Sequence, residues 1–232
     1  MEEPVPPLVV DIDGTLTRPD ASIDPRVVDP LREWAASAPV VVATGKAFPY
    51  PIGLCRFLGV PPNVIAENGG VVAVEGATEV VYNGDPEAAR AVAADYREAG
   101  HDLGWGSVDF VNRWRETELA VARDQPLGPL DRIATDHGMV VVDTGYAYHV
   151  KAPEVDKATG LETVAALLDR PLAGFVAVGD SENDAEVLAA VDRSFAVANA
   201  DQTAKAAAGT VTDASFADGF LEALERIRDT AE

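Results

Sequence analysis

The sequence predicts an α/β protein: a doubly wound, Rossmann-like parallel-sheet core with an α+β domain inserted into it. Two observations predict this fold. Short apolar runs alternate with helical patterns in both end regions of the chain, whereas strand-like runs in the middle follow one another closely. Alternation favours a parallel sheet with helices on both faces, and closely spaced strands favour a small module of neighbouring pairs. The 232 residues, 47% of them hydrophobic, suit one large domain or two small ones.

The expected core strands are short apolar runs, at residues 8–10, 40–43, 64–66, 175–178 and 195–198. The expected core helices are residues 25–36, which follow the capping residue Asp24, and residues 158–168, 185–191 and 220–227. In the middle we expect a hairpin at 71–74 and 79–82, a helix at 86–99, and strands within 107–122 and 139–152. These elements divide the chain into a first core part (1–79), an inserted domain (80–151) and a second core part (152–232).

The composition indicates an acidic surface around an apolar interior. The chain has 39 acidic and 18 basic residues, a formal net charge of −21, and only four lysines: Lys46, Lys151, Lys157 and Lys205. This charge repels nucleic acids and anionic membranes, so we expect neither as a partner. Excess acid, scarce lysine and abundant Ala and Val favour adaptation to high salt, and an ordinary acidic cytosolic surface is the alternative. Where lysines are scarce, those that remain are better candidates for specific roles.

No segment of the sequence suggests export or membrane insertion. No apolar run reaches the ~20 residues that a membrane helix needs. The acidic start, Met-Glu-Glu-Pro, lacks the apolar stretch of a secretory signal. Cys55 is the only cysteine, so it cannot form an internal disulfide. We therefore expect a cytoplasmic protein, and we leave open whether it forms a homodimer.

Polar side chains gather at the carboxyl ends of the predicted core strands, where ligands bind in such sheets. Asp11 and Asp13 follow the first strand, Thr44-Gly45-Lys46 follows the second, and Gly179-Asp180-Ser181-Glu182-Asn183-Asp184 follows another, while Asp156-Lys157 opens a helix. Two carboxylates one residue apart repel each other unless a positive group lies between them or one holds a proton. Carboxylates, a hydroxyl and a lysine together indicate a site for a hard cation such as Mg²⁺ and for a phosphoryl group.

These segments resemble, in order, the four motifs of the haloacid dehalogenase-like hydrolase superfamily. DIDGTLT is similar to the first motif, ATG to the second, DK to the third and GDSEND to the fourth. Each motif alone has an ordinary explanation, because Asp-Gly often forms a turn and acids often begin helices, but the ordered set is specific. The inserted domain resembles the α+β cap of this superfamily. NRWRE at 112–116, GYAYH at 145–149 and ENGG at 67–70 resemble the archaeal-type phosphoglycolate phosphatases.

The resemblance implies a role for each motif residue. Asp11 would be the nucleophile that forms an aspartyl-phosphate, and Asp13 would be the general acid and base. Thr44 would hydrogen-bond a phosphoryl oxygen, and Lys157 would pair with Asp11 and the phosphate. The ligands of Mg²⁺, the expected cofactor, would be Asp11, Asp13 through its backbone carbonyl, Asp180 and Asp184. The residues that bind the phosphoryl end of the substrate would be Lys157, Thr44, Gly45 and Asn183.

The inserted domain offers cations for the rest of the substrate. If residues 109–121 form a strand, Arg113 and Arg115 share one face, and if residues 145–151 form another, His149 and Lys151 share a face. We therefore predict Arg113, Arg115 and His149 as further substrate-binding residues. The alternative is that these arginines pair with nearby acids on a solvated face.

The leading interpretation is a Mg²⁺-dependent phosphatase that hydrolyses 2-phosphoglycolate, a small anionic phosphomonoester, to glycolate and phosphate. A phosphatase for another small metabolite, such as a sugar phosphate, is the alternative within the same superfamily. A phospho-acceptor signalling module would also use a doubly wound sheet, an acidic Mg²⁺ site and an aspartyl-phosphate, but such modules lack an inserted domain. Steady release of phosphate from a small ester would distinguish an enzyme from such a module.

Overall fold

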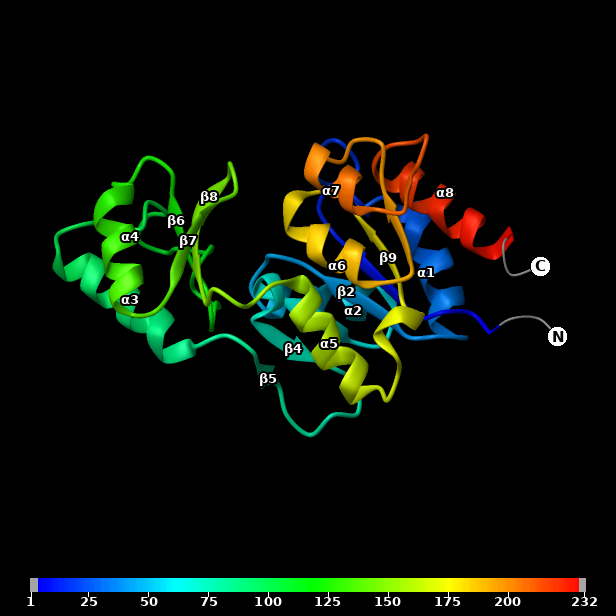
Figure 1. The fold of residues 1–232 in the computed structure, drawn as a ribbon, viewed down its shortest axis with the longest axis horizontal. Coiled ribbons are helices and arrows are strands. Elements are labelled where there is room, and N and C mark those ends of the chain that lie inside the picture. The colour runs from blue at the N-terminus through cyan, green and yellow to red at the C-terminus, as the bar shows by residue number, and fades with distance from the viewer. Residues whose placement is uncertain (1–3, 230–232) are drawn as a thin grey trace.

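The structure, a computed structural model, describes residues 4–229 as two parts that lie side by side (Figure 1). The larger part, the core, contains a sheet with the strand order β11-β10-β9-β1-β2-β3-β4-β5. Its strands are β1 (Leu8–Asp11), β2 (Val40–Ala43), β3 (Asn63–Ala66), β4 (Val71–Ala73), β5 (Val81–Tyr82), β9 (Val176–Gly179), β10 (Arg193–Ala196) and β11 (Thr210–Val211). Strand β4 pairs antiparallel with β3 and with β5, and the other pairs of this sheet are parallel. The predicted parallel core and its hairpin are therefore confirmed.

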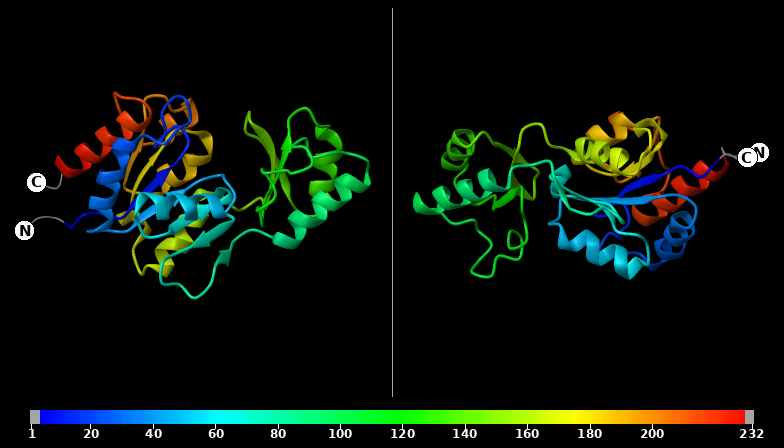
Figure 2. Two further views of the ribbon diagram at one scale, coloured as in Figure 1. Left: turned by 180° about the vertical axis from the view of Figure 1, so that it is seen from behind. Right: turned by 90° about the horizontal axis from the view of Figure 1, so that it is seen from below.

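Helices cover both faces of this sheet, because neighbouring residues along a buried strand point to opposite sides. Leu8 and Val10 of β1 pack in one apolar cluster and Val9 packs in the other. The helices of the first cluster are η1 (Pro25–Val27), α1 (Val28–Ala35), α2 (Pro49–Leu58) and α8 (Phe216–Asp229). Those of the second are α5 (Lys157–Leu167), α6 (Ala185–Ala190) and α7 (Gln202–Ala207). The right-hand view of Figure 2 shows these two layers on either side of the sheet.

The smaller part, the cap, has its own sheet and its own apolar core. Its strands β6 (Leu119–Ala122), β7 (Val140–Asp143) and β8 (Ala147–Lys151) pair antiparallel in the order β6-β8-β7, and its helices are α3 (Pro86–Glu98) and α4 (Leu127–Asp136). Asp85 caps α3 by accepting hydrogen bonds from the backbone N–H groups of Glu87 and Ala88. Both helices lie on the side of the small sheet that faces away from the core (Figure 1). The other side of the sheet is thus free to face the core.

The chain leaves the core after β5 and returns at α5. Since β5 pairs with β4, the residues directly after position 79 still belong to the core sheet. Three one-turn helices complete the core: η2 (Glu67–Gly69), η3 (Leu172–Gly174) and η4 (Glu182–Asp184). Across residues 4–229, no helix combines the length and the apolar character that a membrane crossing requires.

The strand expected at residues 109–121 is wrong over most of its length. Residues 107–118 form turns and bends, and the strand starts only at Leu119. The side chain of Asn112 closes this loop, since it accepts a hydrogen bond from the N–H of Ala120 and donates one to the carbonyl of the same residue. Arg113 and Arg115 therefore do not share a strand face: Arg113 is exposed, whereas Arg115 turns toward the core.

Candidate active site

The motif residues meet at the carboxyl ends of the adjacent strands β2, β1 and β9. Asp11 is the last residue of β1, Thr44 follows β2, and Asp180 follows β9. Lys157 is the first residue of α5, which starts with a capping box between Asp156 and Thr159. Parallel strands end at one edge of a sheet, so four segments far apart in the sequence converge there.

Lys157 is the centre of the site. Its ammonium is fully buried and lies 2.7 Å from Oδ1 of Asp11 and 2.6 Å from Oδ1 of Asp184. It also donates a hydrogen bond of 3.2 Å to Oδ1 of Asn183. Burial alone would lower the pKa of Lys157, but the carboxylates of Asp11 and Asp184 outweigh burial and raise that pKa above its usual value. Lys157 is therefore a permanent positive charge in the site.

The acids of the site outnumber its buried cation. Oxygen atoms of Asp11, Asp180 and Asp184 lie within 4.8 Å of one another. Burial raises the pKa of Asp11 well above its usual range, Lys157 opposes this only in part, and the two other aspartates add to it. Burial and the Asp184 carboxylate raise the pKa of Asp180 to about 7. Three crowded carboxylates, with only one ammonium to balance them, offer oxygen ligands that suit a hard divalent cation.

Gly14 allows this crowding. Its φ of +86° lies in the left-handed region, and a Cβ atom there would lie 2.1 Å from Oδ2 of Asp180. Asp180 can thus approach the loop after β1, where Thr15 donates a hydrogen bond of 3.2 Å to its Oδ1. Asp184 is fixed separately, because its Oδ2 accepts hydrogen bonds from the backbone N–H groups of Asp180 and Ser181.

Asp13 has a lysine partner of its own. The loop after β1 directs Asp13 toward Lys46, with 2.8 Å between Oδ2 and Nζ, and both side chains are about half exposed. The backbone N–H of Lys46 also donates to the buried hydroxyl of Thr44, which leaves the hydroxyl proton of Thr44 for another acceptor. The two aspartates of the first motif are thus separated in space and paired with different lysines.

A cavity of about 430 Å³ lies between core and cap above these residues. Its core side includes Asp11, Asp13, Thr44 and Lys46, and its cap side includes Arg115, Thr144, Tyr146 and His149.

A second cavity of about 290 Å³ adjoins the first and also reaches Lys151 and Lys157. The residues that line both cavities are Asn68, Thr144, His149, Ser181 and Asn183. Lys46, Lys151 and Lys157, three of the four lysines, thus line the cleft formed by the two cavities. This agrees with the expectation that the few lysines of the chain have specific roles.

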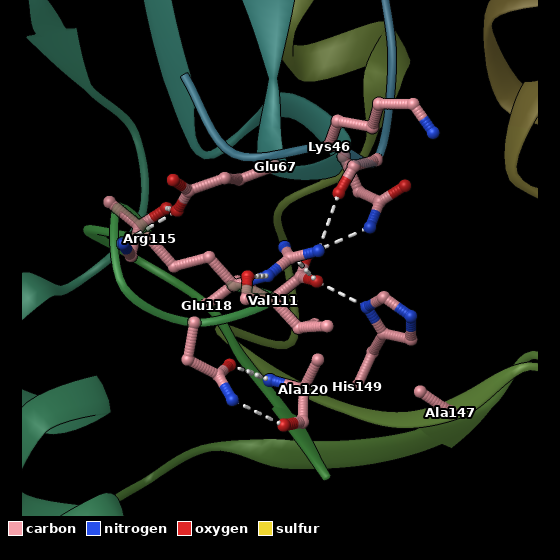
Figure 3. A network of polar contacts seen from close by, with 12 residues as sticks. Lys46, Glu67, Val111, Arg115, Glu118, Ala120, Ala147 and His149 are labelled. Carbon is pink, nitrogen blue, oxygen red and sulfur yellow. Dashed lines mark hydrogen bonds and ion pairs between the residues drawn. The ribbon is translucent and has the colours of Figure 1, made fainter. Parts of the chain in front are cut away.

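Arg115 and His149 do not stand free in the cleft, because both bind the carboxylate of Glu118 (Figure 3). Arg115 donates from Nη1 to Oε1 of Glu118 at 2.8 Å, from Nε to the carbonyl of Val111, and from Nη2 to the carbonyl of Gly45 in the core. Nδ1 of His149 contacts the same Oε1 atom. Burial would raise the pKa of Glu118, but Arg115 and His149 outweigh it and hold the pKa below its usual value.

A second buried glutamate, Glu67, joins cap and core by different contacts. Its carboxylate accepts hydrogen bonds from the backbone N–H groups of Glu116 and Thr117 and from the hydroxyl of Thr117. Burial raises the pKa of Glu67, and these neutral donors offset it only in part. We define the seam as the contacts of Glu118 and Glu67, which fasten residues 115–118 of the cap to the core.

Sequence reasoning missed Glu118 and Asn68 and left the role of Lys46 open. Asn68 has a φ of +53°, and the sequence pointed to it only as part of ENGG at 67–70, a segment that resembles the archaeal-type phosphatases. Its side chain donates to Oε2 of Glu118 at 2.7 Å and accepts from Nδ2 of Asn183 at 3.0 Å. A Cβ atom on Gly45 would lie 2.9 Å from Oδ1 of Asn68, so the glycine of the second motif makes room for this amide. The scarcity of lysine was the signal available for Lys46.

The sequence is similar to those of known proteins over nearly its whole length. The family model of haloacid dehalogenase-like hydrolases matches residues 8–111 and 130–224. The chain belongs to this family. A protein named phosphoglycolate phosphatase from Natronomonas pharaonis is 72% identical over 97% of this chain and 99% of the relative. One of the same name from Haloarcula marismortui is 57% identical over 99% of this chain and 100% of the relative.

Solved structures show the same fold at low sequence identity. Thermoplasma acidophilum 0175 superposes with a TM-score of 0.81 at 22% identity, covering 96% of this chain and 98% of the other. A haloacid dehalogenase-like hydrolase from Bacteroides thetaiotaomicron has a TM-score of 0.77 at 21% identity, covering 96% and 99%. The expected fold class, a doubly wound core with an inserted cap, is therefore confirmed, as is membership in the hydrolase family.

Proposed function

We propose that this chain is a Mg²⁺-dependent phosphatase that hydrolyses 2-phosphoglycolate to glycolate and phosphate through an aspartyl-phosphate on Asp11. The observation that supports this most is the buried Asp11–Lys157 pair at the base of a cap-covered cavity, in a chain whose relatives are named for this activity. Membership in a hydrolase family favours an enzyme over a phospho-acceptor signalling module.

In the first step, a carboxylate oxygen of Asp11 attacks phosphorus and the bond from phosphorus to the ester oxygen breaks. Lys157 holds the attacking carboxylate in place, because its ammonium donates a hydrogen bond of 2.7 Å to Oδ1 of Asp11. The hydroxyl of Thr44 and the ammonium of Lys157 stabilise charge on the phosphoryl oxygens. Asp13 donates its proton to the glycolate oxygen as it leaves.

In the second step, Asp13 acts in the opposite sense. It removes a proton from a water molecule that attacks the phosphorus of the aspartyl-phosphate, and the bond between phosphorus and Asp11 breaks to release phosphate. Asp13 is suited to both steps because its carboxylate is half exposed at the cavity rather than buried beside Lys157. Asp11 returns to its starting carboxylate.

The residues that would hold Mg²⁺ are Asp11, Asp180, Asp184 and the backbone carbonyl of Asp13. When bound, the ion supplies positive charge that offsets the repulsion among the carboxylates and the phosphate. The donor set fits this role, since one buried ammonium faces three acids whose oxygens lie within 4.8 Å of one another.

The cap side of the cavity would recognise the substrate carboxylate. Arg115 uses three of its five N–H groups within the protein, which leaves two, and His149 binds Glu118 through Nδ1, which leaves Nε2. Both residues line the cavity that contains Asp11. Arg113 is exposed and is not among the residues that line either cavity. A substrate contact by Arg113 remains a prediction.

The test is phosphate release by the purified protein from 2-phosphoglycolate, glucose 6-phosphate and p-nitrophenyl phosphate, in low and high KCl. We expect kcat/KM for 2-phosphoglycolate to exceed that for the other two esters by at least about tenfold. A site that binds the substrate carboxylate discriminates against analogues that lack a carboxylate. EDTA should abolish activity and Mg²⁺ should restore it. Asp11→Asn should remove activity, whereas Asp29→Asn on the surface should not. A preference for glucose 6-phosphate would contradict the substrate assignment and favour the sugar-phosphate alternative.

A further inference from the structure

An unbroken row of hydrogen bonds joins the cap to Lys157. The ammonium of Lys157 donates to Oδ1 of Asn183, Nδ2 of Asn183 donates to Oδ1 of Asn68, and Nδ2 of Asn68 donates to Oε2 of Glu118. Distances along this row are 3.2, 3.0 and 2.7 Å. Glu118 belongs to the cap, Asn68 is 50 residues away in the one-turn helix η2 after β3, and Asn183 belongs to the fourth motif.

The two ends of the row set its direction. A carboxylate can only accept hydrogen bonds and an ammonium can only donate them, whereas an amide does one at each end. Asn68 must therefore turn its NH₂ group toward Glu118, which leaves its oxygen for Asn183. Asn183 must then turn its NH₂ group toward Asn68 and its oxygen toward Lys157. This oxygen also accepts from the hydroxyl of Ser181 at 2.7 Å.

Glu118 is itself held in one place. Arg115 and His149 occupy its Oε1 atom, so Oε2 is the atom that faces Asn68. Its side chain is 1% exposed. Residues 112–129, which include Glu118, lie between the two stretches that match the family model.

We propose that Glu118 is a positioning residue: by setting the direction of the two amides, the docked cap orients Asn183 and thereby holds Lys157 against Asp11. The inference rests on the proposed phosphatase activity for its kinetic test. It implies that Lys157 is correctly held only while residues 115–118 of the cap lie on the core, because a displaced Glu118 frees both amides to rotate.

The decisive experiment exchanges the chemistry of two neighbouring positions. In Glu118→Gln, Arg115 retains the amide oxygen, so the new NH₂ group faces the NH₂ group of Asn68. Both asparagines must rotate, and an N–H group of Asn183 then faces Lys157. We expect kcat to fall about tenfold to one-hundredfold, the range for a hydrogen bond to a charged group. Asn68→Asp alone places two buried carboxylates in contact and should also be impaired.

The double variant Glu118→Gln/Asn68→Asp restores the direction of the row. The amide introduced at position 118 donates to the carboxylate introduced at position 68, and the other oxygen of that carboxylate accepts from Asn183. Aspartate also tolerates the φ of +53° at position 68. We expect kcat within about threefold of wild type, which is a strongly non-additive result. Glu67→Gln/Asn68→Asp is the matched control: it has the same net charge and alters an equally buried seam glutamate, but it leaves two carboxylates at positions 118 and 68, so it should not recover.

If kcat recovers in both double variants, net charge alone matters. If kcat recovers in neither, the row has no direction to restore. Either result overturns the proposal. The kinetic assay uses p-nitrophenyl phosphate as substrate. If the protein hydrolyses this ester but not 2-phosphoglycolate, only the substrate assignment is refuted. If wild type hydrolyses no ester, the proposed function fails. Urea unfolding of wild type, Glu118→Gln, Asn68→Asp and the Glu118→Gln/Asn68→Asp double variant then tests the row. We expect a favourable coupling in the free energy of unfolding between positions 118 and 68, and zero coupling would contradict the proposal.

Discussion

Two buried charge clusters face each other across the cleft, and their charges are arranged in opposite ways. In the core, one cation, Lys157, lies between the carboxylates of Asp11 and Asp184. In the cap, one carboxylate, Glu118, lies between Arg115 and His149. Burial is the main cause that raises the pKa of Asp11, and the surplus of acid in the core cluster adds to it. In the cap, the pKa of Glu118 is lowered because its basic partners outweigh burial.

The difference separates a chemical role from a positioning role. A surplus of buried negative charge is costly for folding but leaves a place for a cation and a phosphoryl group. The cap cluster has no such surplus, because the carboxylate of Glu118 is bound by Arg115, His149 and Asn68. We therefore expect substitutions in the core cluster to affect the chemical step directly, and those in the cap cluster to affect stability, substrate binding and the positioning of Lys157.

The largest expected effect is that of Lys157→Ala on catalysis. Removing the cation leaves Asp11 and Asp184 without their lysine partner and, in the proposed mechanism, removes the charge that stabilises the phosphoryl group, so kcat should fall at least about 10²- to 10³-fold. Lys205→Ala, on the surface side of α7, is the matched control and should change kcat less than about twofold. Steady-state phosphate release measures both variants. Similar kinetics for the two lysine variants would remove the distinction between the clusters.

The next effect compares two arginines of one loop. Arg115→Ala leaves Glu118 buried with one basic partner fewer and should cost about 3–5 kcal/mol of unfolding free energy. Arg113→Ala removes an exposed side chain and should stay within ~0.5 kcal/mol. Urea unfolding in KCl gives both values. In the folded fraction, Arg115→Ala should raise KM for 2-phosphoglycolate more than for p-nitrophenyl phosphate, and an equal rise for both would exclude carboxylate recognition by Arg115.

A smaller effect concerns pH and the two seam glutamates. The raised pKa of Glu67 means that the folded state binds its proton more tightly than the unfolded state, so this group's contribution to stability falls as pH rises from ~4.3 through the folded value. The lowered pKa of Glu118 has the opposite sign: its contribution is present above ~4.3 and is lost as pH falls through the folded value.

Unfolding free energies of Glu67→Gln and Glu118→Gln between about pH 3 and 8 test this contrast. Relative to wild type, Glu67→Gln should gain stability as pH rises above ~4.3, and Glu118→Gln should lose its disadvantage as pH falls below ~4.3, by about 1.4 kcal/mol for each unit of pKa shift. Parallel pH curves for the two variants would show that the cationic partners of Glu118 do not distinguish it from Glu67.

The smallest expected effect is that of salt on the melting-temperature difference between wild type and a variant of a buried cluster. At a net charge of −21, the melting temperature of wild type should rise strongly between ~0.1 and ~2 M KCl, because screening weakens repulsion across the surface. Buried pairs are screened much less. The melting-temperature difference between wild type and Glu118→Gln should therefore stay nearly constant over the same range. A wild-type curve that is flat or falls would argue against salt adaptation.

Much of the core could be predicted because its signals are local. The apolar runs at 40–43 and 64–66 match β2 and β3 to within one residue, and Asp156 caps α5 as its position before Lys157 suggested. The helix α2 was not among the expected helices, and its two prolines, Pro49 and Pro51, lie in its first turn, where proline is well suited. The strand expected at 109–121 failed because the contacts of Asn112 close a loop that no local pattern reveals.

The sequence by itself determined which residue types gather at the core site: aspartates, a threonine and a lysine follow strand ends or open a helix, and parallel strands bring such positions to one edge. Only the tertiary structure decided which charges are paired. The assignment of Lys157 to Asp11, of Lys46 to Asp13, and of Arg115 and His149 to Glu118 depends on distances between segments far apart in the chain. The physical reason is that hydrogen bonds and buried ion pairs act over about 3 Å, whereas apolar periodicity records only which side of an element is buried.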